Sequence, residues 1–183
     1  MISWKPSRDQ IAAALNAPID DVIAPDLKVL FCGINPGLYS GAVGHHFARP
    51  GNRFWPTLHL SGFTDRRLSA FEERELLAGS VGVTNFVNRA TATADGVERR
   101  ELVVGAKALE AKAVEYHPLF VAVLGLGAFR TAFGIAKASV GPQSETLGPS
   151  RLWLLPNPSG LNAHYQLDAL ASAFACLRVA AGA

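Results

Sequence analysis

Short runs of mainly apolar residues recur along this chain and alternate with segments of helical periodicity. Runs of this length, ended by Gly, Pro or Asn, are typical of strands that are covered on both faces of a sheet. Strands that alternate with helices build a three-layer α/β/α sandwich around a central, mainly parallel sheet. We therefore predict this α/β fold, with strands at residues 28–32, 81–87, 120–125 and 151–155.

The segments between these runs predict the helices. The longest expected helix spans residues 98–116 and ends before Pro118, which cannot continue a helix. A second helix is expected over residues 65–77, with Asp65 or Ser69 as its N-terminal cap. Further helices are expected at residues 52–60, 127–133 and 165–179.

The length of 183 residues fits one domain with a short extension. We expect an N-terminal helical extension over residues 1–22, with helical spacing from Ser7, and a single domain over residues 23–183. Residues 33–50 are rich in glycine and are expected to form a long loop, which is uncommon in a compact domain and often functional. The region around residues 141–149 is expected to consist of turns.

The composition is that of a globular protein, since 49% of the residues are hydrophobic and 17% are charged. The two cysteines, Cys32 and Cys176, fall in apolar patterns and are interpreted as small buried side chains. No run approaches the roughly 18 apolar residues of a membrane span, and residues 1–10 contain no signal-peptide core. We expect a cytoplasmic monomer with no membrane partner.

The net charge of +2 permits binding to a polyanion without the extreme basicity of a histone-like protein. Several arginines fall in polar connecting segments of the first two-thirds of the chain. This placement fits an ordinary solvated surface as well as it fits a patch that faces phosphates. These residues are Arg49, Arg53, Arg66, Arg67, Arg89, Arg99 and Arg100.

Two Asn-Pro segments stand where predicted strands end. The segment GINPG (33–37) follows the first strand, and NPSGLN (157–162) follows the last. Ligands of open α/β sheets bind just past the carboxyl ends of the strands. The two segments therefore predict one shared site.

Asn35 is the first candidate for chemistry in that site. Its amide does not titrate near neutral pH, so it cannot act as a strong base, but its carbonyl oxygen can accept a hydrogen bond from a water and orient it. Pro36 and Gly37 would hold the segment in a tight turn. Taken alone, the same tripeptide is also an ordinary turn.

Two further segments make a family resemblance specific. GHHF (44–47) and NRFW (52–55) lie between the Asn-Pro segments. With them, the chain resembles mismatch-specific uracil-DNA glycosylases, in the branch that includes thymine-DNA glycosylases. The resemblance extends in order from about residue 21 to the C-terminal helix.

The resemblance implies a role for each matching position. Asn35 would position the hydrolytic water, and Phe47 would stack on the extruded base. Leu161 would fill the gap that the flipped nucleotide leaves, with Gly160 and Asn162 near the widowed guanine. Family members often carry serine where this chain has Asn162, so the reach to that guanine differs. The other implied site residues are Ile34, His46, Asn85 and Thr91 in the base pocket, and Asn157 and Ser159 in the DNA-binding loop.

Asp95 has two interpretations. It follows the second predicted strand in a polar loop, where it could cap the next helix or close a turn. If the loop folds over the pocket, its carboxylate could activate water or stabilise the sugar cation beside Asn35.

The resemblance implies a monofunctional hydrolase that removes uracil, with thymine and etheno-cytosine as further candidates, from G:U and G:T mismatches in double-stranded DNA. A non-catalytic binder of mismatched or damaged DNA is the main alternative, and a hydrolase of free deoxynucleosides is another. No cofactor is expected. His45 and His46 lack a carboxylate or cysteine at ligand spacing, so no metal site is predicted.

Overall fold

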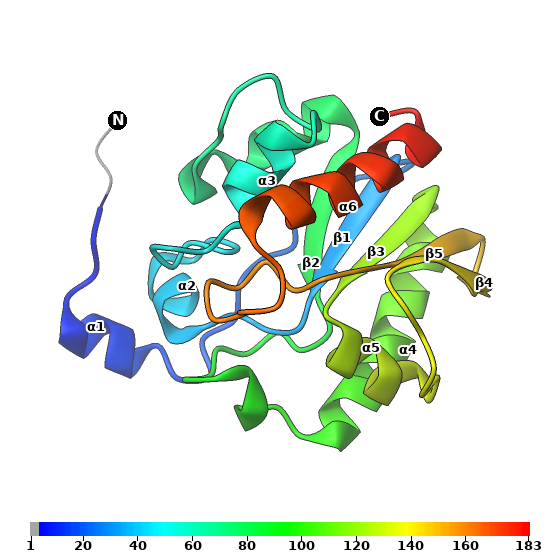
Figure 1. The fold of residues 1–183 in the computed structure, drawn as a ribbon. Helices are drawn as coiled ribbons and strands as arrows, with labels where there is room; N and C mark the ends of the chain where they lie inside the picture. Colours follow the sequence, from blue (N-terminus) through cyan, green and yellow to red (C-terminus); the bar gives the residue numbers. More distant parts are fainter. Residues whose placement is uncertain (1–3) are drawn as a thin grey trace.

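The computed structural model describes residues 4–183 and is built around one five-stranded sheet. Its strands lie in the order β2-β1-β3-β5-β4 (Figure 1). Strand β4 runs antiparallel to β5, and the other neighbouring pairs are parallel. The bounds are β1 (Val29–Gly33), β2 (Val81–Asn85), β3 (Phe120–Leu124), β4 (Gly141–Leu147) and β5 (Ser150–Leu155).

Helices cover both faces of the sheet, which confirms the predicted three-layer α/β/α sandwich (Figure 1). On one face lie α3 (Phe54–Leu60), the 3-10 helix η1 (Ala70–Gly79) and α6 (Leu167–Ala181). On the other face lie α4 (Arg99–Tyr116) and α5 (Leu126–Phe133). The remaining helices are α1 (Arg8–Ala13), α2 (Leu38–Val43) and the short η2 (Ala94–Gly96).

Strand β1 lies between β2 and β3 and is buried along its whole length. Because side chains alternate along a strand, Phe31 enters one apolar cluster and Cys32 the other. The ring of Phe31 packs against Phe54 of α3 and Phe174 of α6, with centroids 5.5 Å away in both cases. These contacts fix α3 and α6 over β1, next to the strand end that carries Asn35.

Two expectations about the segments between the predicted strands were wrong. The region around residues 141–149 holds edge strand β4, whose mostly polar and exposed side chains give no apolar run. The Gly-rich segment 33–50 is not one long loop, because α2 lies within it and ends at Gly44 in a left-handed conformation with a φ of 72°.

Helices α1 and η1 are shorter than expected. Helix α1 covers only residues 8–13 of the expected 7–22, and Asn16 follows with a φ of 64°, which a continuing helix does not allow. Ser69, rather than Asp65, caps η1, since it forms a capping box with Glu72. Within residues 4–183, no helix is both long and apolar enough to cross a membrane.

Candidate active site

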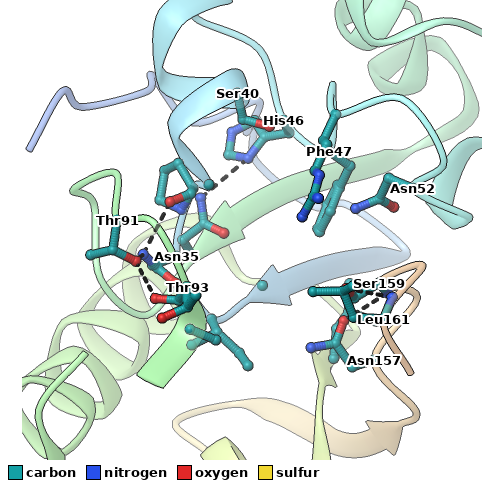
Figure 2. A pocket seen from close by; sticks show the side chains of 18 of the residues that line it. Asn35, Ser40, His46, Phe47, Asn52, Thr91, Thr93, Asn157, Ser159 and Leu161 are labelled. Carbon is teal, nitrogen blue, oxygen red and sulfur yellow. Dashed lines mark hydrogen bonds between the residues drawn. The ribbon is translucent and has the colours of Figure 1, made fainter. Parts of the chain in front are cut away.

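A pocket of about 470 Å³ opens where β1, β2 and β3 end. Gly33 at the end of β1 is paired with Asn85 at the end of β2, which brings the two following loops together. Asn35, Thr91 and Thr93 lie on one side of the pocket, and Phe47 and the loop of residues 157–162 face them (Figure 2). The structure thus places every predicted site residue except Gly160 on one pocket wall or another.

The amide of Asn35 has a fixed orientation. Its nitrogen donates to the carbonyl oxygens of Pro36 at 3.0 Å and Arg89 at 3.1 Å, and to the hydroxyl of Thr91 at 2.7 Å. Carbonyl oxygens only accept hydrogen bonds, so the NH₂ group must be on this side. The amide oxygen accepts no hydrogen bond from residues 4–183 and is free for a water in the pocket.

Thr91 holds this orientation. Its side chain is buried and donates to the carbonyl of Thr93 at 2.6 Å, so its oxygen is left to accept from Asn35. Its backbone is also tied to the first Asn-Pro segment, because Thr91 donates to the Pro36 carbonyl and Leu38 donates to the Thr91 carbonyl. Thr91 therefore orients Asn35 in addition to lining the pocket, whereas the sequence had suggested only a pocket position.

Phe47 offers an aromatic face to the pocket. One side of its ring stacks on Phe54, with centroids 4.1 Å apart and planes at 28°. Its backbone has a φ of 52°, which is rare for a bulky side chain and requires support from neighbours. That support comes from both sides: the N–H of His46 donates to Glu73, and the N–H of Ala48 donates to the hydroxyl of Ser40 at 3.0 Å.

His46 is buried, and its two ring nitrogens have different hydrogen-bond partners. Its Nε2 lies 3.1 Å from the Asp20 carbonyl, which can only accept, so Nε2 carries the proton. Its Nδ1 then accepts from the amide nitrogen of Asn85 at 3.3 Å. Burial lowers the pKa of His46, which favours this neutral form. The pair holds the Asn85 amide oxygen against Gly33, where a side chain larger than hydrogen would collide with it.

Glu73 of η1 was missed by the sequence reasoning. It is 5% exposed, and one carboxylate oxygen accepts from the His46 N–H at 2.8 Å while the other lies 2.8 Å from Nδ1 of His45. A buried carboxylate needs such partners to offset its lost hydration. Ser40, Ile19 and Thr93, which line the pocket, were missed too, and none of them has a local motif that would single it out.

The second Asn-Pro loop is organised by its own side chains. The Asn157 side-chain oxygen accepts from the Ser159 N–H at 2.9 Å, and the Ser159 hydroxyl accepts from the Leu161 N–H at 3.3 Å. Asn162 donates to the Asn157 carbonyl and accepts from the His164 N–H. The side chain of Leu161 is left 76% exposed at the pocket rim, while both ends of the Asn162 amide are engaged within the loop.

Arg53 anchors this loop to the start of α3. Its guanidinium donates to the carbonyls of Ser159, Asn162 and Tyr165, and its backbone N–H donates to the Pro158 carbonyl at 3.0 Å. Gly160 packs so closely on the Gly51 carbonyl that a Cβ there would lie 2.7 Å from its oxygen. Gly160 does not line the pocket, and its lack of a side chain lets the two loops pack closely.

Asp95 lines the pocket from η2, and its side chain is exposed. It does not cap the following helix, because Glu98 occupies that position and forms a capping box with Glu101. No hydrogen bond within residues 4–183 engages its carboxylate. Capping of the following helix is therefore wrong, and Asp95 is among the residues that line the pocket.

An ion pair holds the segment that carries Asp95. The guanidinium of Arg89 makes two contacts of 2.7 Å with Glu101 of α4 and donates to the Gly96 carbonyl at 3.0 Å. The hydrogen bonds from Arg89 and from the Glu98 N–H lower the pKa of Glu101 to about 2. Because the Arg89 carbonyl also accepts from Asn35, one residue links the Asn35 amide to the Asp95 segment.

Of the arginines named in the sequence analysis, some are held by hydrogen bonds or ion pairs and others make no salt bridge. Arg53 and Arg89 are engaged as described, and Arg66 pairs with Glu72 and Glu75. These three are therefore not free for phosphates. Within residues 4–183, the other four make no salt bridge: Arg49, Arg67, Arg99 and Arg100.

Cys32 and the histidines do not add a nucleophile or a metal centre. Cys32 is buried in β1, and burial raises the pKa of its thiol, so it stays protonated and unreactive. Cys176, which was also expected to be buried, is exposed on α6. Across residues 4–183, no three His, Cys, Asp or Glu side chains are grouped so that they could hold a metal ion.

Comparison with known families gives one match that spans most of the chain. The family model of the Uracil DNA glycosylase superfamily matches residues 21–178. The matched region contains all five strands and every residue that lines the pocket except Ile19.

Proposed function

The chain belongs to the uracil DNA glycosylase superfamily, and from this premise we propose that it hydrolyses the N-glycosidic bond of uracil mispaired with guanine in duplex DNA. The orientation of Asn35 is the observation that carries this proposal. Three acceptors hold the amide nitrogen, so the amide oxygen is presented to the pocket as an acceptor for one water. The products are a free base and an abasic site.

The substrate base must leave the helix to reach Asn35. Extrusion costs a few kcal/mol and costs less at a mismatch, which favours U:G over U:A. Leu161, exposed at the rim, is suited to fill the gap in the base stack. The flipped base would stack on the free face of Phe47, with its edge toward Asn85 and the backbone at Ile34.

Bond cleavage leaves the electron pair of the glycosidic bond on the departing pyrimidine and positive charge on the sugar. Amide and backbone donors around the base can stabilise that anion. The water held by Asn35 then adds its oxygen to the sugar carbon and loses a proton. An amide accepts a hydrogen bond from this water but cannot take the proton.

Asp95 is the group that we propose as proton acceptor. Asp95 lines the pocket, and no hydrogen bond within residues 4–183 engages its carboxylate. It follows Thr91, which orients Asn35, in the same loop. This loop is held by Arg89, which pairs with Glu101 and donates to the Gly96 carbonyl. The charge of Asp95 would also stabilise the sugar cation. Thymine and etheno-cytosine are further candidate substrates, since the pocket of about 470 Å³ exceeds what one small pyrimidine requires.

The orientation of the Asn162 side chain bears on the preference for guanine as the opposite base. Each end of the Asn162 amide makes one hydrogen bond within the loop, which fixes its orientation and leaves one N–H and one lone pair for a contact with the widowed guanine. We propose that the mismatch preference comes mainly from the lower cost of extrusion and only secondarily from Asn162.

The test is a glycosylase assay on duplexes that contain U:G, U:A or T:G, with alkali to reveal abasic sites. Wild type is expected to cleave U:G fastest, and Asn35→Ala is expected to lower turnover by about 10² while DNA binding persists. Asp95→Asn is expected to lower turnover while DNA binding persists, because an amide cannot take the proton of the water. Glu110→Gln, an exposed site on α4, is the control.

Two results would overturn the proposal. A wild-type enzyme in excess that binds the U:G duplex but yields no abasic product would indicate a non-catalytic mismatch binder. Turnover of free deoxyuridine at a rate that DNA does not exceed would indicate a nucleoside hydrolase.

A further inference from the structure

A second cavity, of about 590 Å³, lies beside the base pocket. It is bounded by the N-terminal segment, by α2, by the loop of residues 47–52 and by residues 67–72. We call it the side groove. Phe47, Arg49 and Asn52 line both cavities, so the side groove shares a wall with the pocket. Figure 2 shows two of these residues, Phe47 and Asn52, next to each other in the base pocket.

Aromatic side chains are exposed in the side groove. Trp4 and Phe71 are 44% and 41% exposed, although large aromatic side chains are usually well buried in a protein of this size. Tyr39 is half-buried, and buried Trp55 contributes to the groove lining and donates its indole N–H to the His46 carbonyl. The groove therefore offers several flat apolar faces to a ligand.

The charge of the side groove is positive. Lys5, Arg49 and Arg67 are exposed, and none of the three forms a salt bridge within residues 4–183. The one carboxylate that lines the groove, Glu72, is already engaged by Arg66 and by Ser69. Free cations next to exposed aromatic faces are the combination that binds single-stranded nucleic acid.

We propose that the side groove binds the unpaired nucleotide that neighbours the extruded uracil in single-stranded DNA. The base would stack on Trp4 or Phe71, and the phosphates would lie near Arg49 and Arg67. The inference rests on the proposed function, because it takes the uracil to occupy the adjoining pocket. The shared wall at Phe47 lets one strand enter both cavities.

A duplex cannot use the side groove in this way. Its flanking bases stay paired and stacked, and only the target nucleotide leaves the helix. A single strand offers the reverse situation, since it has no opposite strand and no paired stack for Leu161 to fill. Stacking in the side groove would replace the contribution that Leu161 makes on duplex DNA.

Fluorescence anisotropy tests this without requiring catalysis. The probe is a short fluorescein-labelled strand that contains one 2′-fluoroarabino-uridine, which resists hydrolysis, used alone or annealed so that guanine lies opposite. Trp4→Ala and Arg67→Ala are each expected to raise the Kd for the single strand about ten-fold, the loss of one stacking or phosphate contact. The Kd for the duplex should change less than about two-fold, within the scatter of a neutral surface change.

Matched controls are Leu15→Ala, 58% exposed on the same N-terminal segment, and Arg100→Ala, an exposed arginine outside the groove. Unchanged single-strand affinity in both groove variants would overturn the proposal, and so would an equal loss on the strand and the duplex. Failure of wild type to cleave U:G would count against the proposed function alone, because the binding measurement needs no cleavage.

Discussion

The side-chain amide of Asn35 donates to the hydroxyl of Thr91 at 2.7 Å, across 56 residues of sequence. Thr91 in turn donates to the Thr93 carbonyl, so the direction of both hydrogen bonds is determined. This short relay orients the amide that we assign to the water. It also distinguishes Asn35, which would contact the water, from Thr91, which orients Asn35.

Thr91→Val is expected to lower kcat on a U:G duplex by about ten-fold, because one hydrogen bond that orients Asn35 is lost and each 1.36 kcal/mol of barrier is a factor of ten. The Kd for DNA should remain unchanged. Thr91→Ser keeps the hydroxyl and should recover most of the rate. Equal kcat values for the valine variant and wild type would show that the carbonyls of Pro36 and Arg89 orient the amide without Thr91.

Leu161→Ala is expected to raise KM for the U:G duplex by about ten-fold, since a smaller side chain leaves the gap in the base stack unfilled. The free energy of unfolding should not change, because Leu161 is 76% exposed. Leu60→Ala, also an exposed leucine, is the control and should leave KM unchanged. A Leu161→Ala enzyme with wild-type KM would remove the basis for the wedge assignment.

The pKa of Glu101 predicts a pH-dependent contribution to stability. Its pKa falls from an ordinary 4.5 to about 2 in the folded protein, chiefly because Arg89 donates to it. A depressed folded pKa means that the stabilisation is present above the unfolded pKa and is lost as pH falls from about 4.5 to about 2. Glu101→Gln should therefore be less stable than wild type at pH 7, and the gap should close toward pH 2.

Urea unfolding at a series of pH values measures this gap. The ion pair is partly exposed to solvent, with the two side chains 31% and 26% accessible, so the effect will be modest and will shrink further in high salt. Glu110→Gln, at an exposed position on the same helix, is the matched control. A Glu101→Gln difference that stays constant from pH 7 to pH 2 would contradict the assigned pKa.

The fold could be predicted from the sequence to the extent that its signals are local. Four buried strands appear as apolar runs, and GINPG (33–37) and NPSGLN (157–162) stand at their ends. Strand β4 could not be found in this way, since an edge strand with a polar, exposed surface has no apolar run. Helix α2 was hidden because glycines dominate its surroundings and suggest a loop.

The residues that hold the site in place could not be predicted, because their hydrogen-bond partners are distant in sequence. Glu73 is 27 residues from His46, and Arg53 is 109 residues from Asn162. Nothing in the sequence around either residue indicates which backbone groups it will meet once the sheet has formed. Many of the residues that face the pocket were found through motifs, whereas Glu73 and the anchoring contacts of Arg53 required the structure.

Glu73 gives the sharpest test of these supports. Its carboxylate anchors His46 and lies beside His45, so it stabilises the left-handed backbone of Phe47. Glu73→Ala should lower kcat/KM on U:G by at least about ten-fold, the value of a hydrogen bond to a charged group. Glu73→Gln retains an acceptor for the His46 N–H and should recover part of that loss. Glu75→Ala, on the same 3-10 helix but exposed, is the control for stability. Thermal unfolding separates the effects: if activity falls only in proportion to folded protein, Glu73 stabilises the domain and does not position Phe47.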